Sequence, residues 1–247
     1  AALDWQYRLS PKLFANFTLR NDQSSRFGKT NRSAMFYSGG VMYNLKRDYW
    51  LRPATWLDEL ELRLSVGSTG NSAIGNYNHL GIVGQTQYGG VPGWALSQPA
   101  NTELGWETQI QTNFGIRATF LTKLTVDLNI YHRKTKDMLQ SVPIPTTTGF
   151  SSQAINIGSM SNRGVEVEVD YNILRTRDYF LTVGVNYAFN RNRIDELFYG
   201  FKEWEMKDYL LNYVVGKSLN FYMPIYAGVD KEDGRPMWYK VGHKGGI

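Results

Sequence analysis

The run from Gly164 to Tyr171 alternates strictly between apolar and acidic residues. The odd positions hold Val165, Val167, Val169 and Tyr171, and the even positions hold Glu166, Glu168 and Asp170. A β-strand places successive side chains on opposite faces, whereas a helix would mix the two sets around its circumference. The run therefore predicts a strand with one apolar face and one acidic face.

The same two-residue period recurs along the chain and predicts eight strands. Their ranges are 3–9, 12–20, 34–45, 57–66, 106–120, 124–136, 163–174 and 179–190. Several exceed the about 5–6 residues of a usual globular strand and match the about 9–11 residues of a tilted membrane strand. The 24 Gly, 16 Tyr, 12 Phe and 7 Trp are typical of turns and half-buried strands. We expect an all-β fold.

The predicted connections between these strands alternate in length. Residues 10–12, 121–123 and 175–178 form short connections, whereas 21–33, 67–105, 137–162 and a segment from 191 onward form long ones. The connection from Lys46 to Trp56 should be short in this scheme and is of moderate length. An up-and-down antiparallel meander would place all short turns at one end, as in bacterial transmembrane barrels. A Greek-key sandwich would usually scramble this order.

Composition removes several classes of function. Cysteine is absent, which excludes a disulfide framework, thiolate metal sites and a cysteine nucleophile. No apolar run approaches the about 20 residues of a transmembrane helix, but the alternating strands of a membrane barrel average to near-neutral hydropathy. The net charge of +5 comes from 27 basic residues scattered among 22 acidic ones, so we expect a mixed-charge surface and no nucleic-acid partner.

Aromatic residues cluster near the ends of the predicted strands. Amphipathic rings at these positions would sit at headgroup level in a membrane barrel. We expect interfacial girdles that draw on Trp5, Tyr7, Tyr49, Trp50, Trp56, Trp106, Phe120, Tyr131, Tyr171 and Tyr179.

A series of short motifs runs in order through most of the chain. The series includes Ser65–Tyr77, Pro99–Glu107, Tyr131–Leu139, Val142–Pro145, Thr148–Ser152, Asn156–Met160, Asn162–Glu166, Val215–Ser218, Ala227–Asp230 and Gly234–Tyr239. Each motif is weak alone, but their number, order and spacing are specific. With these motifs the chain resembles the SusC/RagA class of TonB-dependent transporters from Bacteroidetes.

The resemblance implies a Gram-negative outer-membrane barrel that closes with 22 strands around an N-terminal plug. It also implies import of oligosaccharides or peptides, energised through the TonB complex, with a SusD-like surface lipoprotein as a lid. We expect no cofactor. Residues 1–247 lack a plug domain, a TonB box and a carboxy-terminal strand that ends in an aromatic residue. We therefore expect an internal to C-terminal part of the barrel, in contact with outer-membrane lipid.

Three groups of residues could suggest a phosphate-binding loop, a calcium site or a histidine metal site. Gly216-Lys217-Ser218 resembles the end of a phosphate-binding loop, but Leu211 stands where the pattern requires glycine. The acids at 230, 232 and 233 do not fit the spacing of an EF-hand calcium loop, so a plain turn is favoured. His79, His132 and His243 form no i, i+4 pair, and we expect no metal site.

The acidic face of 164–171 could suggest glycoside hydrolysis. Glu166, Glu168 and Asp170 lie roughly 7 Å apart at alternate positions, but hydrolysis needs two acids that face each other across a cleft. We therefore interpret them as acids on the wall of a polar channel. No catalytic residue and no enzyme activity are predicted.

Aromatic side chains of the predicted loops are the candidates for ligand contact, because flat rings pack against sugar faces or peptide groups. The candidate substrate-binding residues are Tyr88, Trp94, Trp204 and Trp238, with Tyr77 and Tyr239 nearby in sequence. The alternative is that these rings pack the loops together or contact a lid partner. Polar loop residues would suit neutral substrates; they are Asn71, Asn76, Gln85, Gln87, Gln98 and Asn101.

These observations leave one leading function and two alternatives. The leading hypothesis is a transport-barrel segment that supplies lumen wall and extracellular loops. The alternative is a soluble all-β carbohydrate-binding or adhesin module. A β-sandwich glycosidase ranks last, because no facing pair of acids is visible.

Overall fold

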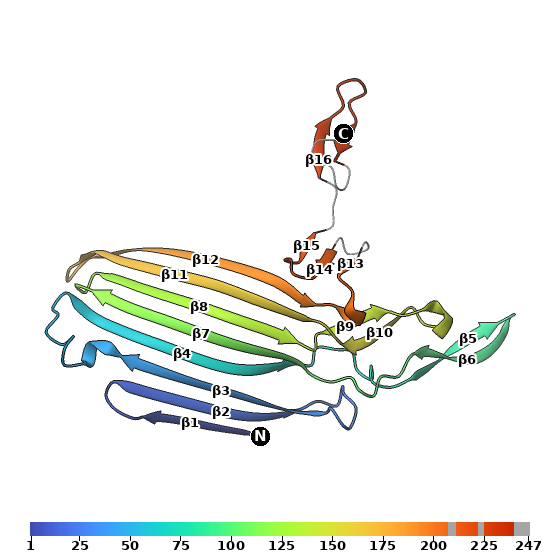
Figure 1. Ribbon diagram of the computed structural model, residues 1–247, viewed down its shortest axis with the longest axis horizontal. Coiled ribbons are helices and arrows are strands. Elements are labelled where there is room, and N and C mark those ends of the chain that lie inside the picture. Colours follow the sequence, from blue (N-terminus) through green and yellow to red (C-terminus); the bar gives the residue numbers. More distant parts are fainter. Residues whose placement is uncertain (207–210, 222–224, 240–247) are drawn as a thin grey trace.

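The computed structural model describes residues 1–206, 211–221 and 225–239. Eight long strands form one antiparallel sheet in which each strand pairs with its chain neighbours among them (Figure 1). They are β1 (Ala2–Arg8), β2 (Leu13–Gln23), β3 (Ser33–Asn44), β4 (Leu57–Asn71), β7 (Glu107–Phe120), β8 (Leu124–Lys136), β11 (Ser159–Arg175) and β12 (Phe180–Glu196). The eight predicted strands and the predicted meander are therefore confirmed.

The connections confirm the expected alternation of lengths. Residues 9–12, 121–123 and 176–179 make short turns, and Figure 1 shows these at one end of the sheet with the long loops at the other. The moderate connection 45–56 lies at the short-turn end and contains the 3-10 helix η1 (Leu45–Arg47). Lys46 Nζ donates to the carbonyl oxygens of Leu51 at 3.0 Å and Ala54 at 2.6 Å, which compacts this connection.

Several strands extend further toward the loop end than the sequence pattern predicted. β4 continues to Asn71 instead of residue 66, β11 begins at Ser159 instead of 163, and β12 ends at Glu196 instead of 190. Backbone pairing continues there through polar residues, for example between Asn162 and Arg133. The apolar alternation stops before the ladder does, so hydrophobic patterning alone places these ends too early.

The long loops contain strands that the sequence analysis treated as irregular. β5 (Ile82–Tyr88) and β6 (Val91–Gln98) form one hairpin, and β9 (Leu139–Pro143) and β10 (Ser152–Asn156) form another, with the 3-10 helix η2 (Thr146–Thr148) between them. After β12 come the 3-10 helix η3 (Phe198–Gly200) and five short strands. These are β13 (Glu203–Met206), β14 (Leu211–Val214), β15 (Asn220–Phe221), β16 (Tyr226–Val229) and β17 (Pro236–Trp238).

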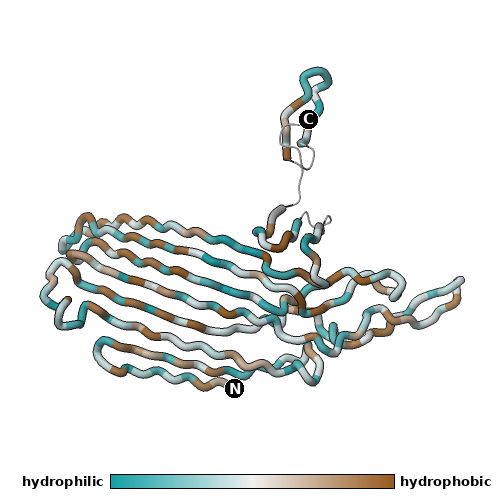
Figure 2. The backbone as a smooth tube through the Cα atoms, in the orientation of Figure 1, coloured by the Kyte–Doolittle hydropathy of each residue, from teal (hydrophilic) through white to brown (hydrophobic). Residues whose placement is uncertain are grey.

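Strand register gives the large sheet one apolar and one polar face. A row of partners across all eight strands comprises Tyr7, Ala15, Val41, Leu64, Phe114, Ile130, Val165 and Phe189. The row one residue away comprises Gln6, Asn16, Gly40, Ser65, Asn113, Tyr131, Gly164 and Asn190. Figure 2 shows the resulting alternation of hydrophobic and hydrophilic residues along each strand. We call the face that carries the apolar row the outward face, and the face that carries the polar row the inward face.

The outward face is a broad exposed apolar surface. Its exposed large side chains include Leu3, Trp5, Phe17, Tyr37, Val41, Leu64, Phe114, Ile130, Val185, Tyr187 and Phe189. A soluble domain would cover such a surface with a second layer, but the sheet here is a single layer that is not closed, with β1 and β12 as its edge strands. Among the described residues, no helix is long and apolar enough to cross a membrane.

The fully buried side chains lie at the loop end. They include Phe27, Leu104, Val142, Ile194, Leu197 and Phe198. Trp106 belongs to this packing, with its ring centroid 5.4 Å from that of Phe27 and 5.6 Å from that of Phe36. The expectation that Trp106 contributes to an interfacial girdle is therefore wrong, because its ring packs the loops.

The remaining girdle residues divide between the two faces. Trp56 and Phe120 stack at the short-turn end with centroids 6.0 Å apart, and Trp5 stacks on Tyr7 on the outward face at 5.6 Å. Tyr131 instead lies on the inward face. Its hydroxyl donates to Asn190 Oδ1 at 3.2 Å, so it is not a girdle residue.

Candidate functional site

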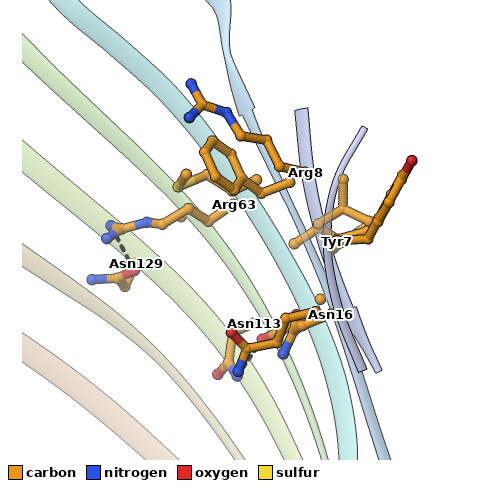
Figure 3. A pocket seen from close by; sticks show the side chains of 15 residues that line it. Tyr7, Arg8, Asn16, Arg63, Asn113 and Asn129 are labelled. Carbon is orange, nitrogen blue, oxygen red and sulfur yellow. Dashed lines mark hydrogen bonds between the residues drawn. The ribbon is translucent and has the colours of Figure 1, made fainter. Parts of the chain in front are cut away.

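The inward face forms a polar wall with hollows over β1 to β8. One hollow is lined by Arg8, Asn16, Arg63, Asn113 and Asn129 together with glycines 40 and 115. Figure 3 shows these five labelled side chains on the same side of the sheet, whereas the ring of Tyr7 projects from the other side of its strand. A second hollow continues toward the loop end over residues such as Thr18, Arg20 and Gln111.

An ion-pair network crosses three strands of this wall. Arg63 Nη2 on β4 lies 2.5 Å from Asp127 Oδ1 on β8, and Arg117 Nη1 on β7 lies 3.9 Å from Asp127 Oδ2. Arg117 Nε also lies 3.7 Å from Glu59 Oε2. Asn129 Nδ2 donates to Asp127 Oδ1 at 3.0 Å. The network holds cationic and anionic groups in fixed positions on the wall.

The acids of β11 lie on the same wall as this network. The register places Glu168 opposite Asp127 and Asp170 opposite Thr125, which confirms the interpretation of these acids as inward-facing. Neighbouring strands of one sheet present their side chains side by side, so the carboxylates do not oppose each other across a cleft. The geometry suits binding of polar groups and gives no support to glycoside hydrolysis.

This network of ion pairs was not predicted from the sequence. Arg63, Arg117 and Asp127 each occupy polar positions of an alternating strand, and that signal was available. Which residues meet depends on the cross-strand register, which a single strand pattern does not fix.

Side-chain amides hold the long loops together at the other end of the sheet. Asn156 Nδ2 donates to the carbonyl oxygen of Gly105 at 2.8 Å, and the Gly105 amide donates to Asn156 Oδ1 at 2.7 Å. Asn101 Nδ2 donates to the carbonyl oxygen of Ala154 at 2.7 Å. These bonds join loop 72–106 to loop 137–158 and fix the β9–β10 hairpin beside it.

This role changes the interpretation of the polar loop residues. Asn76 Oδ1 accepts from Arg26 Nε at 3.3 Å, and Gln98 Nε2 donates to the carbonyl oxygens of Tyr77 at 3.1 Å and Leu80 at 3.0 Å. Asn71 Oδ1 accepts from the backbone amide of Ala73 at 2.8 Å. Four of the six amides proposed for ligand contact therefore hold loop structure, and the other two, Gln85 and Gln87, are exposed on β5.

Tyr88 and Trp94 lie on one hairpin but on opposite faces of it. Trp94 pairs with Gln85 and therefore shares its face of the ladder. Tyr88 lies three residues from Gln85 on the same strand, so its side chain points to the opposite face. Tyr88 is 91% exposed and Trp94 is 75% exposed. The two rings cannot form a single platform for one ligand.

Trp204 and Trp238 lie in two further units. Trp204 on β13 packs edge-on against Phe198 at 4.7 Å and lies 5.3 Å from the ring of Tyr213, so its ring packs against other aromatic rings of the protein. Burial raises the pKa of Tyr213 within the same cluster. Trp238 on β17 is 51% exposed and meets Tyr226 edge-on at 5.6 Å. The four predicted ligand aromatics are thus distributed over three units and do not converge.

Two of the remaining motifs are turns. The Gly216 amide donates to the Ile194 carbonyl at 2.7 Å and Ser218 Oγ donates to the Asn192 carbonyl at 2.9 Å, so the Gly-Lys-Ser segment pairs along β12. Asp230 Oδ1 accepts from the Glu232 amide at 2.9 Å, which makes the acidic segment a turn between β16 and β17.

The histidines show no metal-like arrangement. His79 Nδ1 lies 3.0 Å from the carbonyl oxygen of Arg26, where it holds loop structure, and His132 lies on the outward face of β8. His243 lies outside the described residues. Within the part of the chain that the structure describes, no group of three His, Cys, Asp or Glu residues is placed to hold a metal ion.

The architecture agrees with comparisons to known proteins. Residues 1–239 match the family model described as "TonB dependent receptor-like, beta-barrel". The chain belongs to this TonB-dependent receptor family. Similar curated proteins include the TonB-dependent receptor SusC of Bacteroides thetaiotaomicron, 35% identical over 202 residues, and the TonB-dependent receptor P3 of Formosa agariphila, 33% identical over 199 residues.

Solved structures of the RagAB peptide importer are also similar. The closed-closed state matches with a TM-score of 0.86 and 38% identity over 97% of this chain, and the open-open state with 0.87 and 38% over 98%. Together with the SusC match, these place the chain in the SusC/RagA type. The SusC and P3 alignments cover 77% of this chain and 20% of each relative, and the RagAB alignments cover 27% of the solved chains. The eight-stranded sheet is thus a portion of a TonB-dependent receptor barrel.

Proposed function

We propose that this chain forms a section of the wall and the extracellular loop surface of a TonB-dependent importer in the outer membrane of a Gram-negative bacterium. The observation that carries the proposal is the two-faced sheet. Eight strands share one exposed apolar face, suited to lipid, and one charged face, suited to an aqueous lumen. The long loops gather at one end, which we assign to the cell exterior. No covalent chemistry is proposed.

Peptides are the substrate class that the inward face fits best. The wall presents Arg63 and Arg117 beside carboxylates, and a peptide carries a charge of each sign at its termini and amides along its length. A neutral oligosaccharide would call for exposed flat rings in the lumen, and here Tyr131 on that face is hydrogen-bonded to Asn190. We place oligosaccharides second.

A SusD-like surface lipoprotein is the proposed lid partner, and the TonB complex the proposed source of energy. The β5–β6 hairpin offers a surface for the lid, because Val83, Trp94 and Leu96 are exposed and share one face of its ladder. Tyr88 lies on the opposite face. We therefore propose Trp94 and Trp238 as exposed contacts to the lid or the substrate, Tyr88 as a substrate contact, and Trp204 as a ring that positions the loop after β12.

Uptake into cells tests this function. Cells that produce the full receptor with its lipoprotein would receive either a mixed synthetic peptide library or a mixture of neutral gluco-oligosaccharides. We expect peptide uptake that disappears when the TonB gene is deleted and that falls in the receptor variant R63Q/R117Q. The matched control is R175Q/R177Q, which removes the same charge at the short-turn end and should transport normally.

Two results would contradict the proposal. Peptide uptake that is unchanged when the TonB gene is deleted would contradict import energised through TonB. A chain that stays monomeric, monodisperse and cooperatively folded in buffer without detergent would favour the soluble all-β binding module instead.

A further inference from the structure

The outward positions of β8, β11 and β12 change from apolar to basic at the loop end. The last fully apolar row across these strands joins Ile130, Val165 and Phe189. Two residues further along, the register joins His132, Arg163 and Arg191, and two further again it joins Lys134, Ser161 and Arg193. Figure 2 shows β11 and β12 becoming hydrophilic toward this end. We call the following residues the basic rim: Lys134, Lys136, Arg163, Arg191 and Arg193.

Few of these basic side chains have a partner among the described residues of the protein. Among the described residues, no ion pair or side-chain hydrogen bond involves Lys134, Lys136, Arg163 or Arg191, and Arg193 Nε lies 3.8 Å from Asp195 Oδ1. Arg163, Arg191 and Arg193 are all exposed.

Several inward-facing arginines, in contrast, have side-chain partners within the protein. Arg63 and Arg117 have carboxylate partners, and Arg133 Nε donates to Gln111 Oε1 at 3.2 Å. The cations of the basic rim are therefore available to a ligand outside the protein, whereas those of the lumen wall are held by it.

The positive charge is also local. The loop-end outward positions of the other long strands from β2 to β7 carry no charged residue; they are Asn21, Gln23, Ser33, Met35, Ser68, Gly70, Thr108 and Ile110. The short-turn end of the outward face is aromatic, with Trp56 stacked on Phe120. A general excess of basic residues does not explain a cluster on one end of three adjacent strands.

The dimensions and level of the basic rim indicate what it binds. Adjacent strands lie about 4.8 Å apart and alternate residues about 7 Å apart, so the patch measures roughly 10 by 14 Å. Its first row lies about 7 Å beyond the last apolar row, which is the level of lipid headgroups. Arginine forks bind phosphate oxygens in bidentate fashion, and clustered basic side chains at this level bind anionic headgroups.

We propose that the basic rim binds the phosphorylated glycolipid of the outer leaflet, lipopolysaccharide, through the phosphates of its lipid A headgroup. The acyl chains of the same lipid would lie against the apolar rows that begin at Val165 and Phe189. This inference rests on the outer-membrane placement proposed above. It adds a lipid-recognition surface on the outside of the barrel, separate from the substrate path on the inward face.

Native mass spectrometry of the full receptor in detergent tests the proposal. The probes are bisphosphorylated lipid A, chemically dephosphorylated lipid A and inorganic phosphate. The variant is R163Q/R191Q, and the matched control is R175Q/R177Q, which removes two exposed arginines from the opposite end of the same hairpin. A heat-shift gel shows that each variant is folded before it is measured.

We expect the wild-type receptor and R175Q/R177Q to bind bisphosphorylated lipid A equally. R163Q/R191Q should bind it about 10- to 30-fold more weakly, and higher salt should weaken the binding of the wild-type receptor. Equal affinity for dephosphorylated lipid A, equal loss in both double variants, or full displacement by millimolar inorganic phosphate would overturn the inference. A receptor that needs detergent but shows no phosphate preference refutes only the lipid site, whereas a receptor that folds without detergent refutes the membrane placement itself.

Discussion

Val167 and Glu168 are consecutive residues of β11 whose side chains lie on opposite faces of the sheet. Val167 stands between Leu128 and Tyr187 on the outward face, whereas Glu168 stands opposite Asp127 on the inward face. One peptide bond thus separates a position suited to lipid from a position suited to water. The same relationship holds along β7, β8 and β12, so the sheet has one apolar and one polar face.

Arginine placed at these two positions should have very different effects. We expect Val167→Arg to lower the free energy of unfolding in lipid vesicles by about 2–4 kcal/mol, because a charge would face hydrocarbon near the middle of the apolar rows. Glu168→Arg should change it by about 1 kcal/mol or less, since the side chain stays in the aqueous lumen. Urea unfolding of the full receptor in vesicles measures both. Equal costs would contradict the assignment of the two faces.

The ion-pair network on the inward face should contribute to stability through Asp127. Replacing it with Asn removes the partner of Arg63 and one partner of Arg117, and we expect a loss of about 1 kcal/mol, because the pair is partly exposed to solvent. Asp170→Asn is the matched control on the same wall and should cost less than about 0.5 kcal/mol. Urea unfolding of both variants in vesicles, at low and at high salt, measures the difference. A larger loss of stability in Asp170→Asn than in Asp127→Asn would show that the ion-pair network does not stabilise the fold.

The short-turn end carries a pH-dependent contact between Lys12 and Asp48. The hydrogen bond from Lys12 holds the pKa of the Asp48 carboxyl below its ordinary value. A lowered native pKa stabilises the fold at pH values above the unfolded pKa, about 3.9, and this contribution is lost as the pH falls through the native pKa.

Asp48→Asn should therefore be less stable than the wild-type receptor at pH 7, and the difference should shrink as the pH is lowered below about 3.9. Asp178→Asn, in another short turn, is the matched control for the removal of a surface carboxylate. Thermal unfolding of the three proteins as a function of pH is the measurement. A difference that is independent of pH would show that the Lys12 contact is not its source.

The ring of Tyr131 covers Gly164 on the inward face. A Cβ atom added at Gly164 would lie 2.3 Å from Cζ of Tyr131, so alanine must displace the ring and its hydrogen bond to Asn190. We expect Gly164→Ala to cost about 1 kcal/mol. In the background of Tyr131→Ala the same change should cost little. A double-mutant cycle measures this coupling, and additive effects would contradict the contact.

The eight strands of the sheet were predictable because each shows a two-residue alternation of apolar and polar residues in its own sequence. Val165 to Tyr171 alternates between lipid-like and water-like residues, and no tertiary information is needed to read that period. The β5–β6 hairpin was not predicted, although Gly89 and Gly90 both adopt positive φ in its two-residue turn and mark it in the sequence. Its strands lack a clean alternation, because neither face packs on the sheet.

The candidate site was only partly predictable for a related reason. The strand pattern placed Glu166, Glu168 and Asp170 on one wall, but the register decides that Asp127 is their neighbour and that Arg63 reaches it. Trp106 fits the two-residue period of the strand that follows it, but its packing against Phe27 and Phe36 depends on contacts between segments far apart in the chain.

Cysteine scanning along β11 tests the central claim most directly, and residues 1–247 contribute no native cysteine. Single cysteines at positions 165 to 170 of the full receptor in vesicles would be treated with a water-soluble thiol reagent, and fluorescent labels at the same positions quenched with brominated lipid. We predict strict alternation: positions 166, 168 and 170 react with the reagent, and labels at 165, 167 and 169 are quenched by lipid. Equal reaction at consecutive positions would contradict a sheet that separates lipid from a polar lumen.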